Sequence, residues 1–158
     1  MKRNVYLVIL AICASLSAVS AQQDIQTALE QSNTKYIKDW LNSGHDVNAL
    51  LYLKEQKMSM IAYAASIGNA EMVQLLIGKG ADVHAKIQFE DALMFAARNG
   101  NLEVIESLLK AGANPLNENK MGKCARDLAQ DAKQTAAYNL LKLETEKRLG
   151  AIRAQKKK

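Results

Sequence analysis

Few side chains in this sequence are suited to catalysis. A nucleophilic mechanism needs a Ser or Cys beside a base, but the two histidines, His45 and His84, lie in short polar segments without an obvious partner. Cys124 is the one thiol outside the first 21 residues. We interpret Cys124 as a structural, half-buried thiol, and a redox enzyme that uses an accessible, low-pKa Cys124 is the alternative.

Sites for metals, phosphate groups and cofactors are not predicted. The sequence has no Cys-x-x-Cys pair and no closely spaced histidines, so the ligand count is too low for a zinc site. Gly78 and Gly80 follow a helical pattern, whereas a phosphate-binding loop precedes a helix. We therefore expect no metal, no cofactor and no nucleotide.

Three short polar side chains recur at equivalent positions. Asp46, Asp82 and Asn114 each follow a glycine by two residues. As a cluster they would suggest carboxylate chemistry, but Asp and Asn commonly brace turns by accepting hydrogen bonds from nearby backbone N–H groups. Successive repeats would also hold them in a row about 10 Å apart, the width of a helix. The recurrence therefore predicts three turns.

The segments around these residues reveal an internal repeat. Residues 44–48, 80–84 and 112–115 are similar, and their glycines are 36 and 32 residues apart. Before each glycine, four apolar residues at spacings of one, four and five residues lie on one helix face, and the glycine supplies the left-handed conformation that ends the helix. The three sets are Tyr36, Ile37, Trp40 and Leu41; Met72, Val73, Leu76 and Ile77; and Val104, Ile105, Leu108 and Leu109.

A second helix is predicted ahead of two of these helices. Alanine pairs at 64–65 and 96–97 occupy matching positions in apolar segments that begin after Ser59 and Asp91. The small residues allow neighbouring helices to approach closely, and Ser59 and Asp91 can cap the helices through a side-chain oxygen. Each unit is therefore expected to contain two antiparallel helices.

This pattern resembles the ankyrin repeat. Residues 61–83 and 93–114 follow the family pattern closely, although residues 59–62 and 91–94 lack the proline and histidine of its Thr-Pro-Leu-His opening. The resemblance implies an all-α solenoid of helix-turn-helix units joined by β-hairpin-like loops, with two full repeats between degenerate caps. Within a domain at 22–149, the units are expected at about residues 24–48, 57–84, 89–116 and 122–149.

The resemblance also implies where a partner would bind. Ankyrin arrays bind through the hairpin tips and the exposed side of the first helices. Phe89 stands where the family prefers glycine, and residues 50–53 are unusually apolar for a loop, which indicates either a local mini-core or a contact patch. The candidate partner-binding residues are Met58, Ser66, Ile67, Ile87, Gln88, Phe89, Glu90, Arg98, Asn99, Lys120, Met121 and Lys123.

The first 21 residues have the pattern of a cleaved secretory signal. Lys2 and Arg3 precede an apolar run, and residues 19–21 place small residues where a signal peptidase cuts. Cleavage before Gln22 lowers the formal net charge from +5 to +3, because the segment carries two basic residues and no acidic one. We expect an exported protein, located in a bacterial periplasm or secreted.

The end of the chain is basic. Residues 142–158 carry seven Lys or Arg against Glu144 and Glu146. We predict a last helix from Thr135 to about Lys147 and interpret residues 150–158 as a solvated, fraying tail. Attachment of this tail to an anionic membrane surface is the alternative.

These observations favour a non-catalytic module that binds another protein, not nucleic acid, and acts as a monomer. Two roles fit such an exported module. One is an immunity or inhibitor protein that neutralises a toxin, and the other is an accessory or chaperone-like partner of an exported enzyme such as a catalase. A thiol-based redox protein is the remaining hypothesis.

Overall fold

The computed structural model describes residues 25–53 and 55–156. The predicted signal segment 1–21 and the last two lysines of the predicted tail lie outside the described residues. Contacts divide the chain into two compact units, one up to His45 and the other from Asp46 onward. Each unit is described by itself.

The first unit contains two short helices, at residues 25–30 and at α2 (Thr34–Asn42). Asn33 caps α2, because its side-chain oxygen accepts a hydrogen bond from the Tyr36 N–H at 3.1 Å. The predicted apolar stripe is confirmed at Ile37 and Leu41, which are buried, whereas Tyr36 is exposed. Trp40 stacks on His45 with ring centroids 4.0 Å apart.

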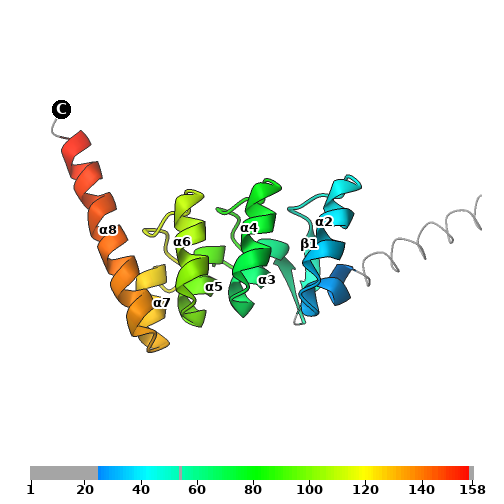
Figure 1. The fold of residues 1–158 in the computed structure, drawn as a ribbon. Helices are drawn as coiled ribbons and strands as arrows, with labels where there is room; N and C mark the ends of the chain where they lie inside the picture. Colours follow the sequence, from blue (N-terminus) through cyan, green and yellow to red (C-terminus); the bar gives the residue numbers. More distant parts are fainter. Residues whose placement is uncertain (1–24, 54, 157–158) are drawn as a thin grey trace, which may run out of the picture. The chain divides into compact units, whose positions relative to one another are not determined.

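The second unit is a two-layered stack of helix pairs. Helices α3, α5 and α7 contact one another in sequence in one layer, and α4, α6 and α8 do so in the other (Figure 1). This arrangement confirms the predicted helix-turn-helix solenoid. Its elements are β1 (Leu50–Leu53), β2 (Gln56–Ser59), α3 (Met60–Ile67), α4 (Ala70–Gly78), α5 (Ala92–Asn99), α6 (Leu102–Lys110), α7 (Ala125–Asp131) and α8 (Thr135–Gln155).

Side-chain caps start the helices of this stack. Ser59 accepts a hydrogen bond from the Ala62 N–H at 3.3 Å, and Asp91 accepts one from the Met94 N–H at 3.0 Å, as predicted. Gly80 and Gly112, just past α4 and α6, have φ of +83° and +96°. These are the left-handed conformations that end a helix at low steric cost in glycine.

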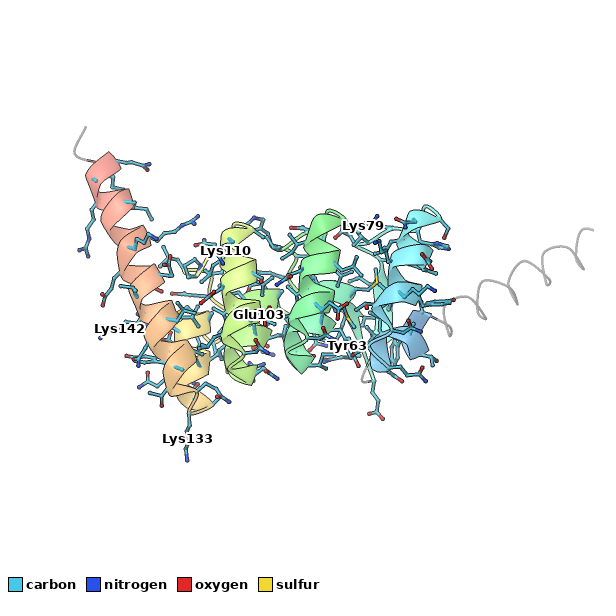
Figure 2. The ribbon with its side chains drawn as sticks, viewed as in Figure 1. Tyr63, Lys79, Glu103, Lys110, Lys133 and Lys142 are labelled. Carbon is cyan, nitrogen blue, oxygen red and sulfur yellow. The ribbon has the colours of Figure 1, made fainter. Side chains whose placement is uncertain are left out.

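Small residues allow α3 and α5 to pack closely. The alanine pairs at 64–65 and 96–97 are fully buried, which confirms their predicted role. In the other layer, the Gln74 side chain of α4 donates to Glu103 Oε1 of α6 at 3.2 Å. Figure 2 labels Glu103 on α6. The apolar core lies between the two layers, and polar pairs of this kind lie outside it.

The first hairpin is a true two-stranded sheet. Strands β1 and β2 are antiparallel, with Leu51 opposite Met58 and Leu53 opposite Gln56. Burial alternates along β1, so Leu51 and Leu53 are buried while Leu50 and Tyr52 are exposed. One face of the segment 50–53 is therefore part of the core, and its other face is exposed to solvent.

Met58 does not lie on an exposed surface, so its prediction as a partner-contacting residue is wrong. Its side chain is only 1% exposed. The pairing with Leu51 places both side chains on the buried face of the hairpin, where Met58 packs under the strands. A one-residue change of register would have exposed it.

The last helix is longer than predicted. Helix α8 continues to Gln155, through most of the segment predicted as a tail (Figure 1). Gly150 costs only about 1 kcal/mol in a helix, and the surrounding Ala, Leu, Lys, Arg and Glu residues favour helix. The ion pair between Lys147 and Glu144, at 3.5 Å, also lies within this helix.

The alternating burial along β1 predicts a large loss of stability at one residue and a small change at its neighbour. Leu53→Ala removes a fully buried side chain and is expected to lower the free energy of unfolding by about 2–5 kcal/mol. Tyr52→Ala removes an exposed side chain and is expected to change it by less than about 1 kcal/mol. Urea unfolding of both variants measures the two values, and similar losses would contradict the observed register.

Candidate functional site

The recurring polar residues Asp46, Asp82 and Asn114 hold turns and are not a reactive cluster. Each side-chain Oδ1 accepts a hydrogen bond from the backbone N–H two residues further on, at 2.8 to 3.2 Å. The Asp82 N–H also donates to the Asn48 side chain at 2.8 Å, which links one repeat to the next. The prediction of a turn role is confirmed.

A cleft of about 270 Å³ lies between the hairpins and helix α5 of the second unit. It brings together five of the candidate residues from the second and third hairpins and from α5. Gln56 and Phe95 complete its wall. The lining residues are Gln56, Ile87, Gln88, Glu90, Phe95, Arg98 and Lys120.

Glu90 and Arg98 form a bidentate ion pair in this cleft. The two guanidinium nitrogens of Arg98 donate to the two carboxylate oxygens of Glu90, at 2.9 and 2.6 Å. Asn119 donates to the same carboxylate at 3.2 Å. The bond from Arg98 is the main cause that lowers the pKa of Glu90, against the opposing effect of burial. The guanidinium is fixed in direction yet remains 42% exposed.

Phe89 occupies a strained backbone position at the tip of the second hairpin. Ile87 and Glu90 exchange backbone hydrogen bonds at 2.7 and 3.0 Å. Gln88 and Phe89, between them, have φ of +51° and +73°, the positive values that a type I′ turn requires. This explains why the family prefers glycine there. The Phe89 ring is 61% exposed, so burial does not offset the strain.

Asn119 organises the third hairpin from a buried position. Its side-chain oxygen accepts hydrogen bonds from the N–H groups of Met121 and Lys123, at 2.9 and 3.1 Å. The Met121 side chain is exposed, whereas Lys123 forms an ion pair with Asp131 at 2.6 Å. The candidate residues at this tip therefore include one free apolar side chain and one cation that is already paired.

Three further candidates, Ser66, Ile67 and Asn99, lie apart from the cleft. Ser66 donates to the Tyr63 carbonyl within α3 at 2.8 Å, and Asn99 of α5 donates to the Ser66 carbonyl at 3.3 Å, which connects the two helices. Ile67 is half-buried. Ile87 lines the cleft but is 9% exposed, so its predicted exposure is wrong. Its backbone closes the turn by pairing with Glu90, and its side chain is buried.

Sequence reasoning missed two residues of the cleft. Phe95 lies three residues before Arg98 on α5 and therefore on the same helix face, a spacing that would have identified it. Gln56 depends on the register of the first hairpin, which pairs it with Leu53. That register has no clear signal in the sequence.

Cys124 has the features of a structural thiol. It is buried at the start of α7, where its thiol donates to Asp127 Oδ2 at 3.1 Å and its N–H donates to the same oxygen at 3.2 Å. Burial is the main cause that raises the pKa of the Cys124 thiol above its ordinary value. A redox site requires the opposite, an accessible thiol with a lowered pKa.

The described residues contain neither a metal-binding cluster nor a membrane-spanning helix. Within the described residues, no three His, Cys, Asp or Glu side chains gather as a metal site requires. Among residues 25–53 and 55–156, no helix combines the length and the apolar run needed to cross a bilayer.

The ion pair in the cleft makes stability depend on pH. The folded pKa of Glu90 is lowered, so the pair stabilises the fold above the unfolded pKa of about 4.3 and is lost as the pH falls through the folded value. Glu90→Gln is expected to cost about 1 kcal/mol at pH 7, a modest value because Arg98 is partly exposed. Unfolding at pH 7 and at about pH 3 should show that this cost is smaller in acid. A cost that is equal at both pH values would mean that the pair does not form.

The strained turn predicts that a glycine stabilises the fold. Phe89→Gly relieves the positive φ and is expected to raise the free energy of unfolding by about 0.5–1 kcal/mol, after the extra chain entropy of glycine is subtracted. Gly122, in the third hairpin, has φ of +69° and open space around it, so Gly122→Ala should be destabilising through backbone strain alone. Thermal unfolding of the two variants measures both shifts. Shifts of the same sign would contradict this account.

Comparison with known proteins agrees with this geometry. A family model described as "Ankyrin repeats (3 copies)" matches residues 25–119 and, in a second alignment, residues 61–147. No curated protein matches the chain. The two alignments together cover both helix layers, the hairpins and the cleft. The chain belongs to the ankyrin-repeat family, and its repeats form a protein–protein interaction module.

Proposed function

We propose that this protein acts after export as an inhibitor of a folded partner protein, in the way that an immunity protein neutralises a toxin. The observation that carries the proposal is the cleft in which Arg98 is held by both oxygens of Glu90. The partner would dock on this cleft and on the neighbouring hairpin tips, and no catalytic step by this chain is involved.

A rigid surface favours a folded partner over an unfolded client. Binding costs less free energy when side chains are already ordered, and the cleft orders its charged groups through Arg98, Glu90 and Asn119. Promiscuous chaperone-like surfaces are instead flexible and often rich in methionine. Inhibitor complexes typically form with little backbone movement, which suits this arrangement.

Export is proposed from the sequence of residues 1–21. Its positive start, apolar centre and small residues before Gln22 are the pattern that signal peptidases recognise. An inhibitor that acts outside the cytoplasm needs such a segment, so the two parts of the proposal are consistent.

Site-specific cross-linking tests the proposal. A photoreactive amino acid replaces Gln88, which lines the cleft with an exposed side chain, in the full chain with a C-terminal tag. We expect covalent capture of one partner protein in the exported fraction, and recovery of the chain with Gln22 as its first residue. Leu143, exposed on α8 outside the cleft, is the matched position for a control cross-linker.

The effect of the chain on the activity of the captured partner then distinguishes an inhibitor from an accessory protein. Its activity should fall as the purified chain is added, with an end point at one chain per partner. A partner whose activity is unchanged or increased would contradict the inhibitor role and support the accessory role. Equal capture from Gln88 and Leu143 would show that the cleft is not the binding site, and a chain that keeps residues 1–21 would contradict export.

A further inference from the structure

A groove lies between α6 and α8, in the layer of second helices and not in the layer of α5, which lines the cleft. It consists of two hollows of about 420 and 240 Å³. Leu109, Glu144 and Lys147 line both hollows, so the two are continuous. The larger hollow alone has the volume of a small-molecule site, for which about 300–1,000 Å³ is typical.

Helix α8 forms one whole wall of this groove. Its residues 140, 144, 147 and 151 line the hollows, and their spacings of four and three place them on one helix face. Helix α8 continues to Gln155, whereas α6 ends at Lys110 (Figure 1). Ala151 therefore lines the smaller hollow with the turn that follows α6. From Leu140 to Ala151 the wall is about 16 Å long, at about 1.5 Å per residue.

The floor of the groove is apolar. Leu109 and Leu140 are half-buried there, and Ala113 and Pro115 are buried at the end near Ala151. None of these five side chains can donate or accept a hydrogen bond. A peptide backbone on this floor would leave its N–H and C=O groups without partners, whereas an aliphatic chain has no such groups. The floor therefore favours an elongated aliphatic ligand.

The charges on the rim favour an anion at one end. Lys110 pairs with Glu106 at 3.8 Å. Lys147 pairs with Glu144 at 3.5 Å. Arg148, which is exposed and lines the smaller hollow, forms no ion pair with any described residue. The groove thus has one positive charge in excess, and a guanidinium group can bind a carboxylate through two hydrogen bonds.

We propose that this groove binds a single long-chain carboxylate of the fatty-acid class. The aliphatic chain lies along Leu109 and Leu140, and the carboxylate accepts hydrogen bonds from Arg148. Removal of the chain from water supplies the main driving force, and the guanidinium group fixes its direction. The site is separate from the cleft, so the inference does not depend on the proposed function.

Titration calorimetry of the purified chain with dodecanoate, below its micelle-forming concentration, tests the inference. We expect binding of one dodecanoate per chain. Dodecanol has the same chain without the charge and should bind about tenfold more weakly, and dodecyltrimethylammonium should not bind. Hexanoate, with half the chain length, should bind about fiftyfold more weakly, because each half-buried methylene contributes about twofold.

Variants make the outcome specific to the groove. Arg148→Ala should weaken dodecanoate binding about tenfold and leave dodecanol binding unchanged, whereas Arg153→Ala removes an exposed cation of α8 outside the groove and should change neither. Ala151→Trp fills the smaller hollow and should weaken both ligands at least about tenfold. Ala154→Trp, at an exposed position of α8 that does not line the groove, is its control. Circular dichroism confirms that each variant is folded.

Three results would overturn the inference. Equal dodecanoate binding by wild type and Ala151→Trp, or no binding at all, would show that the groove is not a site. Dodecanol binding as tight as that of dodecanoate would show that Arg148 does not hold a carboxylate. Co-sedimentation with anionic phospholipid vesicles, without binding of free dodecanoate, would assign the basic end of α8 to a membrane surface instead. Partner capture through Gln88 is measured separately, so a failure here leaves the proposed function standing.

Discussion

The close contact between α3 and α5, repeated between α5 and α7, sets the geometry of the second unit. Alanine pairs at 64–65 and 96–97 are buried without any exposed surface, so the helices approach to the distance that small side chains permit. Each repeat buries its apolar face only against its neighbours, and the same translation therefore recurs from repeat to repeat. Hydrogen bonds also link neighbouring repeats at the hairpins, from the Asp82 N–H to Asn48 and from Asn119 to Glu90.

Stacking also explains where polar residues are found. The turn residues Asp82 and Asn114 satisfy backbone N–H groups that the helices cannot reach, and Asn48 extends this bonding to the next repeat. Because these bonds are local or between adjacent repeats, the outer side chains of the hairpins are free to vary. Recognition can thus change through exposed residues such as Phe89 without loss of the fold.

The sequence predicts the parts of this structure that depend on local pattern. Residue types and their spacing predict the repeat period, the helix faces, the turns and the caps at Ser59 and Asp91. The position of Met58 is not predicted, because a shift of one residue in the strand register exchanges the two faces of a hairpin, and the sequence has no clear signal for that register. The end of α8 is likewise ambiguous, since several good helix formers follow Lys147 and only one glycine opposes them.

Asn119 shows that the surface of one repeat depends on its neighbour. It occupies the buried position that Ile87 holds in the preceding hairpin, yet it is polar, and its amide donates to Glu90 of that hairpin at 3.2 Å. An apolar residue there would remove the two hydrogen bonds that hold the third hairpin and also one of the groups that fix the Glu90 carboxylate, and through it Arg98. The polar side chain at this buried position therefore acts on both the hairpin and the cleft, and it couples two repeats into a single surface.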